Sequence, residues 1–219
     1  MSPTYPSLIA VGFLLGWSVA WPPGPINAEI ARRSSSGRFA SGVMLLIGAS
    51  SGDAIWALGV SLGVGLLFTN PTLRLAMGVV SIALLIALAV LFLRGAWRAL
   101  SAPAEPGSPA QARPEGVGGA YALGAAMALT SPWNVAFWLA AMGRPELAGA
   151  DAAHLLAMAA AVIAGANSWG LLWAGATAGL HRGLTGAAKR WWTIGVDAAT
   201  GALMLYFAYG SAARLLAAS

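Results

Sequence analysis

The chain has 219 residues, of which 58% are hydrophobic and only 9% are charged, and its formal net charge is +5. This composition excludes an ordinary water-soluble globule of this length and indicates an integral membrane protein. The absence of cysteine excludes a disulfide framework, a thiolate metal site and a cysteine nucleophile.

Six apolar runs are long enough to cross about 30 Å of hydrocarbon as helices. None shows the alternation of a barrel strand, so all six are predicted to be helical. The predicted spans cover residues 8–30, 42–68, 75–93, 120–142, 152–179 and 194–216. We therefore predict an all-α integral membrane protein with six transmembrane helices.

Basic residues predict the orientation of these spans. Nine of the twelve Lys and Arg side chains lie in the loops that follow the first, third and fifth spans. The positive-inside rule places these loops in the cytoplasm and both termini outside. Because the positive charge is confined to such loops, it does not indicate nucleic-acid binding.

One connection, residues 101–119, is rich in proline and glycine and cannot bury enough apolar surface to fold alone. It is predicted to be a cytoplasmic linker between a first three-helix unit, residues 1–100, and a second, residues 120–219.

The first helix of each unit is interrupted by proline. The motif "WPPGPIN" breaks the first span, and "LTSPWN" breaks the fourth, so that Pro25-x-Asn27 aligns with Pro132-x-Asn134. Because each unit has an odd number of spans, the second enters the membrane from the opposite face, which predicts two inverted repeats. The alternative is coincidence, since proline is common in membrane helices.

A proline cannot donate to the carbonyl four residues earlier, so Pro132 frees the carbonyl of Ala128. Pro22, Pro23 and Pro25 do the same in the first span. The helix that restarts after each break, with Thr130 or Ser131 as a possible cap for the second, leaves amides that attract a carboxylate. Backbone breaks survive in a membrane where they line a cavity or are buried in protein. We predict a substrate site at both breaks, formed by Gly24, Pro25, Asn27, Pro132, Trp133 and Asn134.

Asp53 lies near the middle of the second span, where a carboxylate is expensive and needs compensation. We predict that it binds the substrate's ammonium group or takes up a coupled proton; a structural ion pair or helix cap is the alternative. Asn167, at a comparable level of the fifth span, is predicted to be its uncharged counterpart in the site, although interhelical hydrogen bonding explains it equally well.

Two further acids carry weaker expectations. Glu29, followed by Arg32 and Arg33, is expected to lie at a solvated helix end, with a cytoplasmic gate as the alternative. Asp197 is expected in the first turn of the sixth span, where an acid complements the helix dipole, and so to be structural.

The motifs "PPGPINAEIARRSSSGRFASG", "GASSGDAIWA" and "TSPWNVAFWLA" resemble those of the LysE/RhtB family of bacterial amino-acid exporters over nearly the whole chain. This resemblance implies export of an amino acid or similar small zwitterion, driven by the proton-motive force. Another small polar solute or a cation is the alternative substrate.

A membrane-embedded enzyme and a scaffold are the competing classes of function. The sequence offers no grouping of His, Asp and Glu for catalysis, so we expect a transporter without cofactor or metal. Its expected partners are an amino acid, protons and the lipid bilayer, with a homodimer possible through glycine-lined helix faces.

Overall fold

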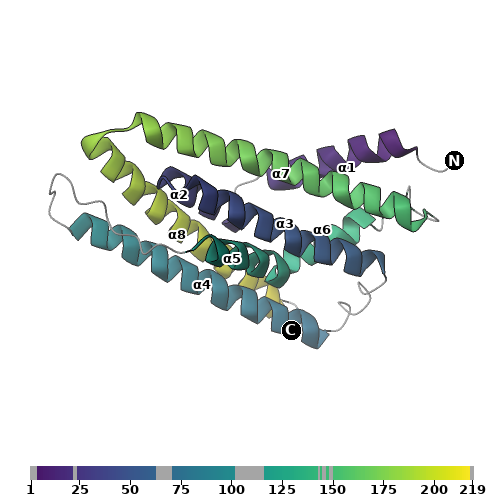
Figure 1. Cartoon of the computed structure of the whole chain (residues 1–219). Helices are drawn as coiled ribbons and strands as arrows, with labels where there is room; N and C mark the ends of the chain where they lie inside the picture. The colour runs from purple at the N-terminus through teal and green to yellow at the C-terminus, as the bar shows by residue number, and fades with distance from the viewer. Residues whose placement is uncertain are drawn as a thin grey trace.

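The computed structural model describes residues 4–21, 24–62, 71–101, 116–142, 144, 147 and 150–217, which form a bundle of helices (Figure 1). The expected all-α class is confirmed. In chain order the helices are α1 (Tyr5–Ala20), α2 (Pro25–Ser35), α3 (Phe39–Ser61), α4 (Pro71–Ser101), α5 (Val117–Thr130), α6 (Pro132–Met142), α7 (Ala152–Gly183) and α8 (Gly186–Ala217).

In the part of the chain that the structure describes, three helices are long and apolar enough to cross a membrane, namely α3, the segment Ile82–Ser101 of α4, and α7. Helices α1 and α2 make a fourth span if the pair, bent by 74°, crosses as one unit. Within the described residues, α5 and the segment Trp133–Met142 of α6 are apolar but shorter. A multi-pass membrane protein is therefore supported, while six spans in two inverted repeats remain a prediction.

Several helices extend beyond their apolar runs. Helix α8 begins at Gly186, ahead of the run that starts at residue 194, and includes Lys189 and Arg190. These residues favour helix but not hydrocarbon, so hydropathy alone misses this part of the element. Pro22, Pro23 and residues 102–115, which make up most of the predicted linker, lie outside the described residues.

The helices pack in pairs that join distant parts of the chain. Helix α1 lies along α7, α5 lies along α3, and α4 lies along α8 (Figure 1). The helix before each break thus packs on the long helix that follows the other break. Helix α2 lies among α3, α7 and α8, and its Ile30 is fully buried.

Glycines allow the first two of these pairs to approach closely. A Cβ on Gly165 would overlap the backbone carbonyl of Phe13 on α1, and one on Gly48 would overlap that of Tyr121 on α5. Gly179, by contrast, has open space around the position of a Cβ. Small residues thus form the α1–α7 and α3–α5 contacts within one chain, as membrane helix packing requires.

Short-range signals set several helix ends. Gly37, between α2 and α3, and Gly186, at the start of α8, adopt positive φ angles of 77° and 51°, which glycine permits without strain. Asp151 caps α7 by accepting a hydrogen bond from the backbone N–H of His154, and this bond lowers the pKa of the Asp151 carboxyl.

Candidate functional site

Asp53 on α3 is held by two neutral donors from α6. The side-chain amide of Asn134 donates to Asp53 Oδ1 at 2.8 Å, and the indole of Trp138 donates to the same oxygen at 3.2 Å. Trp138 is almost fully buried, with 1% of its surface exposed. Both hydrogen bonds that the described residues make to the carboxylate thus end on Oδ1.

The break between α5 and α6 leaves the Ala128 carbonyl without its helical donor, because Pro132 has no N–H. Two side chains replace that donor. The Trp56 indole donates to Ala128 O at 3.2 Å, and the Asn134 amide donates to it at 3.3 Å. The Thr130 hydroxyl donates to the Ala126 carbonyl within α5.

The break between α1 and α2 has a similar arrangement. The Asn27 side-chain amide donates to the carbonyl of Ala20, at the end of α1, at 2.6 Å. Gly24 precedes α2 in an extended conformation, and Pro25 is the first residue of that helix. The Trp173 indole of α7 donates to the Asn27 carbonyl at 3.0 Å. At both breaks, therefore, an asparagine in the second helix binds the end of the first.

The two long central helices meet through a polar pair. The Ser50 hydroxyl of α3 donates to the Asn167 side-chain oxygen of α7 at 2.6 Å. Ser50 precedes Asp53 by less than one helical turn, so the pair lies close to the carboxylate along α3. Each partner stands two residues after a glycine of a close helix contact, Gly48 or Gly165.

The structure brings some of the predicted site residues together. Asp53 and Asn134 are in direct contact, and Asn167 joins α3 through Ser50. Gly24, Pro25 and Asn27 are half-buried at the other break, whereas Trp133 has 70% of its surface exposed. Among the described residues, no group of three or more His, Asp and Glu side chains could hold a metal ion.

Among the polar contacts that sequence reasoning missed are those of Trp56 and Trp138. Trp56 follows Asp53 by three positions, and Trp138 follows Asn134 by four positions. These spacings place each tryptophan on the same helical face as its neighbour in the site. Helical spacing, combined with the donor capacity of the indole, is therefore the signal that could have found both.

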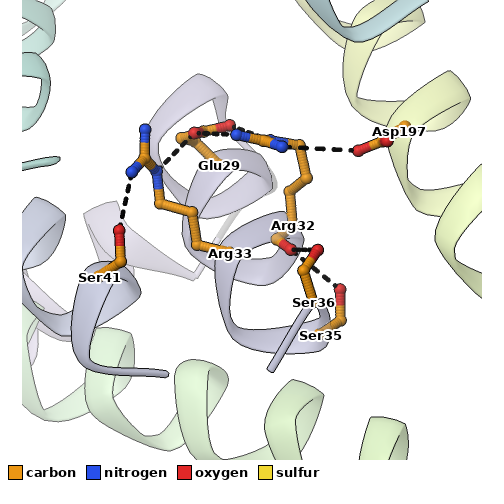
Figure 2. Close-up of polar contacts among 7 residues, drawn as sticks. All are labelled: Glu29, Arg32, Arg33, Ser35, Ser36, Ser41 and Asp197. Atoms are coloured by element: carbon orange, nitrogen blue, oxygen red, sulfur yellow. Dashed lines mark hydrogen bonds and ion pairs between the residues drawn. The ribbon is translucent and has the colours of Figure 1, made fainter. Parts of the chain in front are cut away.

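A buried charge cluster lies in the second half of α2 (Figure 2), where Glu29 and Arg33 have 0% and 1% of their surfaces exposed. Arg33 Nε donates to Glu29 Oε1 at 2.6 Å, and Arg32 donates to both Glu29 oxygens at 2.7 and 2.8 Å. The expectation of a solvated helix end at Glu29 is wrong. Two guanidinium groups, three and four residues further along the helix, pair with the carboxylate and permit its burial.

This cluster, Glu29 with Arg32 and Arg33, joins α2 to its neighbours. Arg33 Nη1 donates to the Ser41 hydroxyl of α3 at 2.8 Å, and the Arg32 guanidinium lies 4.4 Å from the centre of the Phe92 ring of α4. Arg32 Nη1 also lies 3.7 Å from Asp197 Oδ1 of α8 (Figure 2). The expectation that Asp197 stands in a first helical turn is wrong, because α8 begins at Gly186 and Asp197 lies well inside it.

Comparison with known proteins identifies the family of this chain. The family model of the LysE type translocators matches residues 17–213. The Chemotactic transduction protein ChpE of Pseudomonas aeruginosa is 30% identical over 132 residues, a match that covers 60% of this chain and 62% of the relative. The matched part is thus less than two thirds of that relative's length. No solved structure matches the chain. The match over most of the sequence confirms the resemblance seen in the motifs, and the chain belongs to the family of LysE-type translocators.

Proposed function

We propose that this protein is a secondary transporter that exports an amino acid or a similar small zwitterion in exchange for protons. The observation that carries the proposal is the Asp53 carboxylate, held from one side by two neutral donors at a helix break. A carboxylate without a paired cation in a membrane is costly, and its common uses are ligand binding and proton transfer. Membership of a translocator family favours transport over catalysis.

The substrate's ammonium group donates to Asp53 in this proposal. Its carboxylate binds the first amides of the helices that begin at Pro25 and Pro132, where Gly24 allows the backbone to approach closely. The side chains of Asn27, Trp133, Asn134 and Asn167 complete the site. The hydrogen bonds of Asn27 and Asn134 to the preceding helix ends support this arrangement, because they stabilise both breaks.

We further propose that the two halves are inverted repeats of three spans each. The packing of α1 on α7 and of α5 on α3 supports this, because the two pairs exchange under such a symmetry. The Ser50–Asn167 pair then joins equivalent helices near the symmetry axis. Alternating access results when the halves rock around the central site.

Arg32 and Asp197 form the gate at one end of the path in this proposal. Their ion pair links α2 of the first half to α8 of the second, and the basic loops next to α2 assign this end to the cytoplasm. Both termini then lie outside. The pair has to separate before a substrate enters from the cytoplasm.

Export of labelled amino acids from cells that make the protein tests the proposal. We expect export of at least one amino acid, and in membrane vesicles its flux should depend on a pH gradient. Asp53→Asn keeps the shape of the side chain but cannot exchange a proton, so it should reach the membrane and lose gradient-driven flux. Asp151→Asn, at an exposed helix cap, is the matched control and should transport normally. Gradient-driven flux at the control rate in Asp53→Asn would remove this carboxylate from the mechanism.

A further inference from the structure

The Ala128 carbonyl is the starting point, because it is an acceptor that must be satisfied without its helical donor. Ala128 is fully buried, and the residue that would supply its helical amide is Pro132. A buried carbonyl that finds no donor is strongly destabilising in a membrane protein. The side chains that donate to this carbonyl therefore stabilise the break, in addition to any other role that they have.

The side-chain amide of Asn134 donates to two acceptors at the break. Its side-chain nitrogen donates to Asp53 Oδ1 at 2.8 Å and to Ala128 O at 3.3 Å. An amide nitrogen carries two hydrogens, so the two bonds use its whole donor capacity. The longer bond to Ala128 is the weaker one, and the carbonyl is completed by the Trp56 indole at 3.2 Å.

Trp56 and Asp53 extend from the same face of α3, three residues apart. Trp56 contacts the end of α5, while Asp53 contacts the beginning of α6. Helix α3 therefore contacts both sides of the break. Asn134 links the two contacts, because its side-chain amide donates both to Asp53 Oδ1 and to Ala128 O.

We propose that Trp56 is a positioning residue for Asp53. By donating to the carbonyl that Pro132 leaves without a helical amide, Trp56 allows Asn134 to keep its short hydrogen bond to the Asp53 carboxylate. The proposal rests on the proposed function only in that Asp53 is the transport carboxylate. It predicts that Trp56 matters because Pro132 is a proline.

A double-mutant cycle tests this dependence. Trp56→Phe removes the indole N–H and keeps an aromatic ring, so Asn134 should shift toward Ala128 and away from Asp53. Pro132→Ala restores an amide that can bond Ala128 O, so Trp56→Phe should have little further effect in that background. Trp97→Phe on α4 is the matched control, because Trp97 has 71% of its surface exposed.

The first measurement needs no substrate. Protein labelled with ¹⁵N-asparagine contains only four asparagines, so the side-chain amide signals of Asn134 can be assigned by its replacement. We expect Trp56→Phe to move the Asn134 signal in the wild-type background but not in Pro132→Ala, and Trp97→Phe to move it in neither. An equal movement in both backgrounds would overturn the proposal.

The second measurement is export of an amino acid that the export test under Proposed function shows to be transported. Loss of one hydrogen bond at the carboxylate should lower kcat/KM about three- to tenfold in Trp56→Phe, and less than about twofold when Pro132→Ala is already present. If Trp56→Phe does not accumulate in the membrane, the double variant with Pro132→Ala should accumulate, because the restored amide satisfies the Ala128 carbonyl. If the double variant does not accumulate either, the proposed dependence on this carbonyl is contradicted. If the amide signals follow the cycle but no amino acid is exported, the positioning role stands and the proposed substrate class fails.

Discussion

Ser50 and Ser51 are neighbours on α3 with different hydrogen bonds. The Ser50 hydroxyl reaches Asn167 of α7 at 2.6 Å as well as the Leu46 carbonyl, whereas the Ser51 hydroxyl binds the Ile47 carbonyl of its own helix. Removing the Ser50 hydroxyl therefore leaves a partner on another helix without its donor, while removing that of Ser51 disturbs only a local bond.

We expect Ser50→Ala to lower kcat/KM for export about three- to tenfold, because Asn167 loses the contact that orients it near Asp53. Ser51→Ala is the matched control and should transport within about twofold of the wild type. Export rates, normalised to the amount of protein in the membrane, measure the difference. Equal rates in the two variants would show that the Ser50–Asn167 bond has no part in transport.

Single-residue predictions were made most readily where a polar group stands out against an apolar background, and the role of these groups in a substrate site remains a prediction. Asp53 and Asn134 were expected in one site, and they are in contact. Glu29 was misjudged because its burial depends on Arg32 and Arg33 turning toward it, and a sequence does not show which way a helix end faces. The tryptophan donors were missed because an indole in an apolar run is also explained by packing alone.

At the scale of helices, Gly165 and Gly179 of α7 offer a matched pair. Both are glycines in one helix, but a methyl group on Gly165 would overlap the Phe13 carbonyl of α1, and one on Gly179 would meet open space. Alanine favours helix over glycine by about 1 kcal/mol where nothing opposes it. Overpacking a close contact costs about 1–3 kcal/mol.

Gly165→Ala should therefore lower the thermal unfolding midpoint of the protein in detergent, because α1 has to move away from α7. Gly179→Ala should leave the midpoint unchanged or raise it slightly. Samples are heated to a series of temperatures, and size-exclusion chromatography measures the fraction of folded protein that remains at each, which gives the two midpoints. If both substitutions lower the midpoint equally, the α1–α7 contact is not as close as its backbone geometry indicates.

The sequence predicted that helices exist more reliably than where they end. Apolar length locates the part of α8 that is compatible with hydrocarbon, but the helix continues to Gly186 because Lys189 and Arg190 form helix as readily as apolar residues do. A Cβ on Gly48 would overlap the Tyr121 carbonyl, whereas one on Gly179 would meet open space. Glycine spacing alone does not distinguish a packed face from an open one.

For the whole molecule, the order of helices in space could not be read from hydropathy. The pairing of α1 with α7 brings Gly165 to Phe13, 152 positions away, and that of α5 with α3 brings Gly48 to Tyr121, 73 positions away. Each pairing depends on backbone contact that no local pattern records. What the sequence could suggest was the relation between the halves, through Pro25-x-Asn27 and Pro132-x-Asn134. The repeated motif predicts which helices pack together only when the symmetry that relates the two halves is also known.

The gate proposal gives a test of motion between the halves. The chain has no cysteine, so cysteines introduced at Arg32 and Asp197 are the only reactive thiols. Arg32 Nη1 and Asp197 Oδ1 lie 3.7 Å apart across the α2–α8 contact. Because a cysteine is shorter than an arginine, a reducible reagent with two thiol-reactive groups is used to bridge the gap between the two thiols. If Arg32 of α2 and Asp197 of α8 separate in each transport cycle, the joined protein cannot turn over.

We therefore expect the reagent to abolish export by the Arg32→Cys/Asp197→Cys variant and a reducing agent to restore it. The reagent should not change the export rate of either single-cysteine variant, because it can attach at only one end. Mass spectrometry of the joined peptides confirms that the bridge has formed. Export at an unchanged rate with a complete bridge would mean that the halves do not separate at this contact, and the path to Asp53 would then have to open elsewhere.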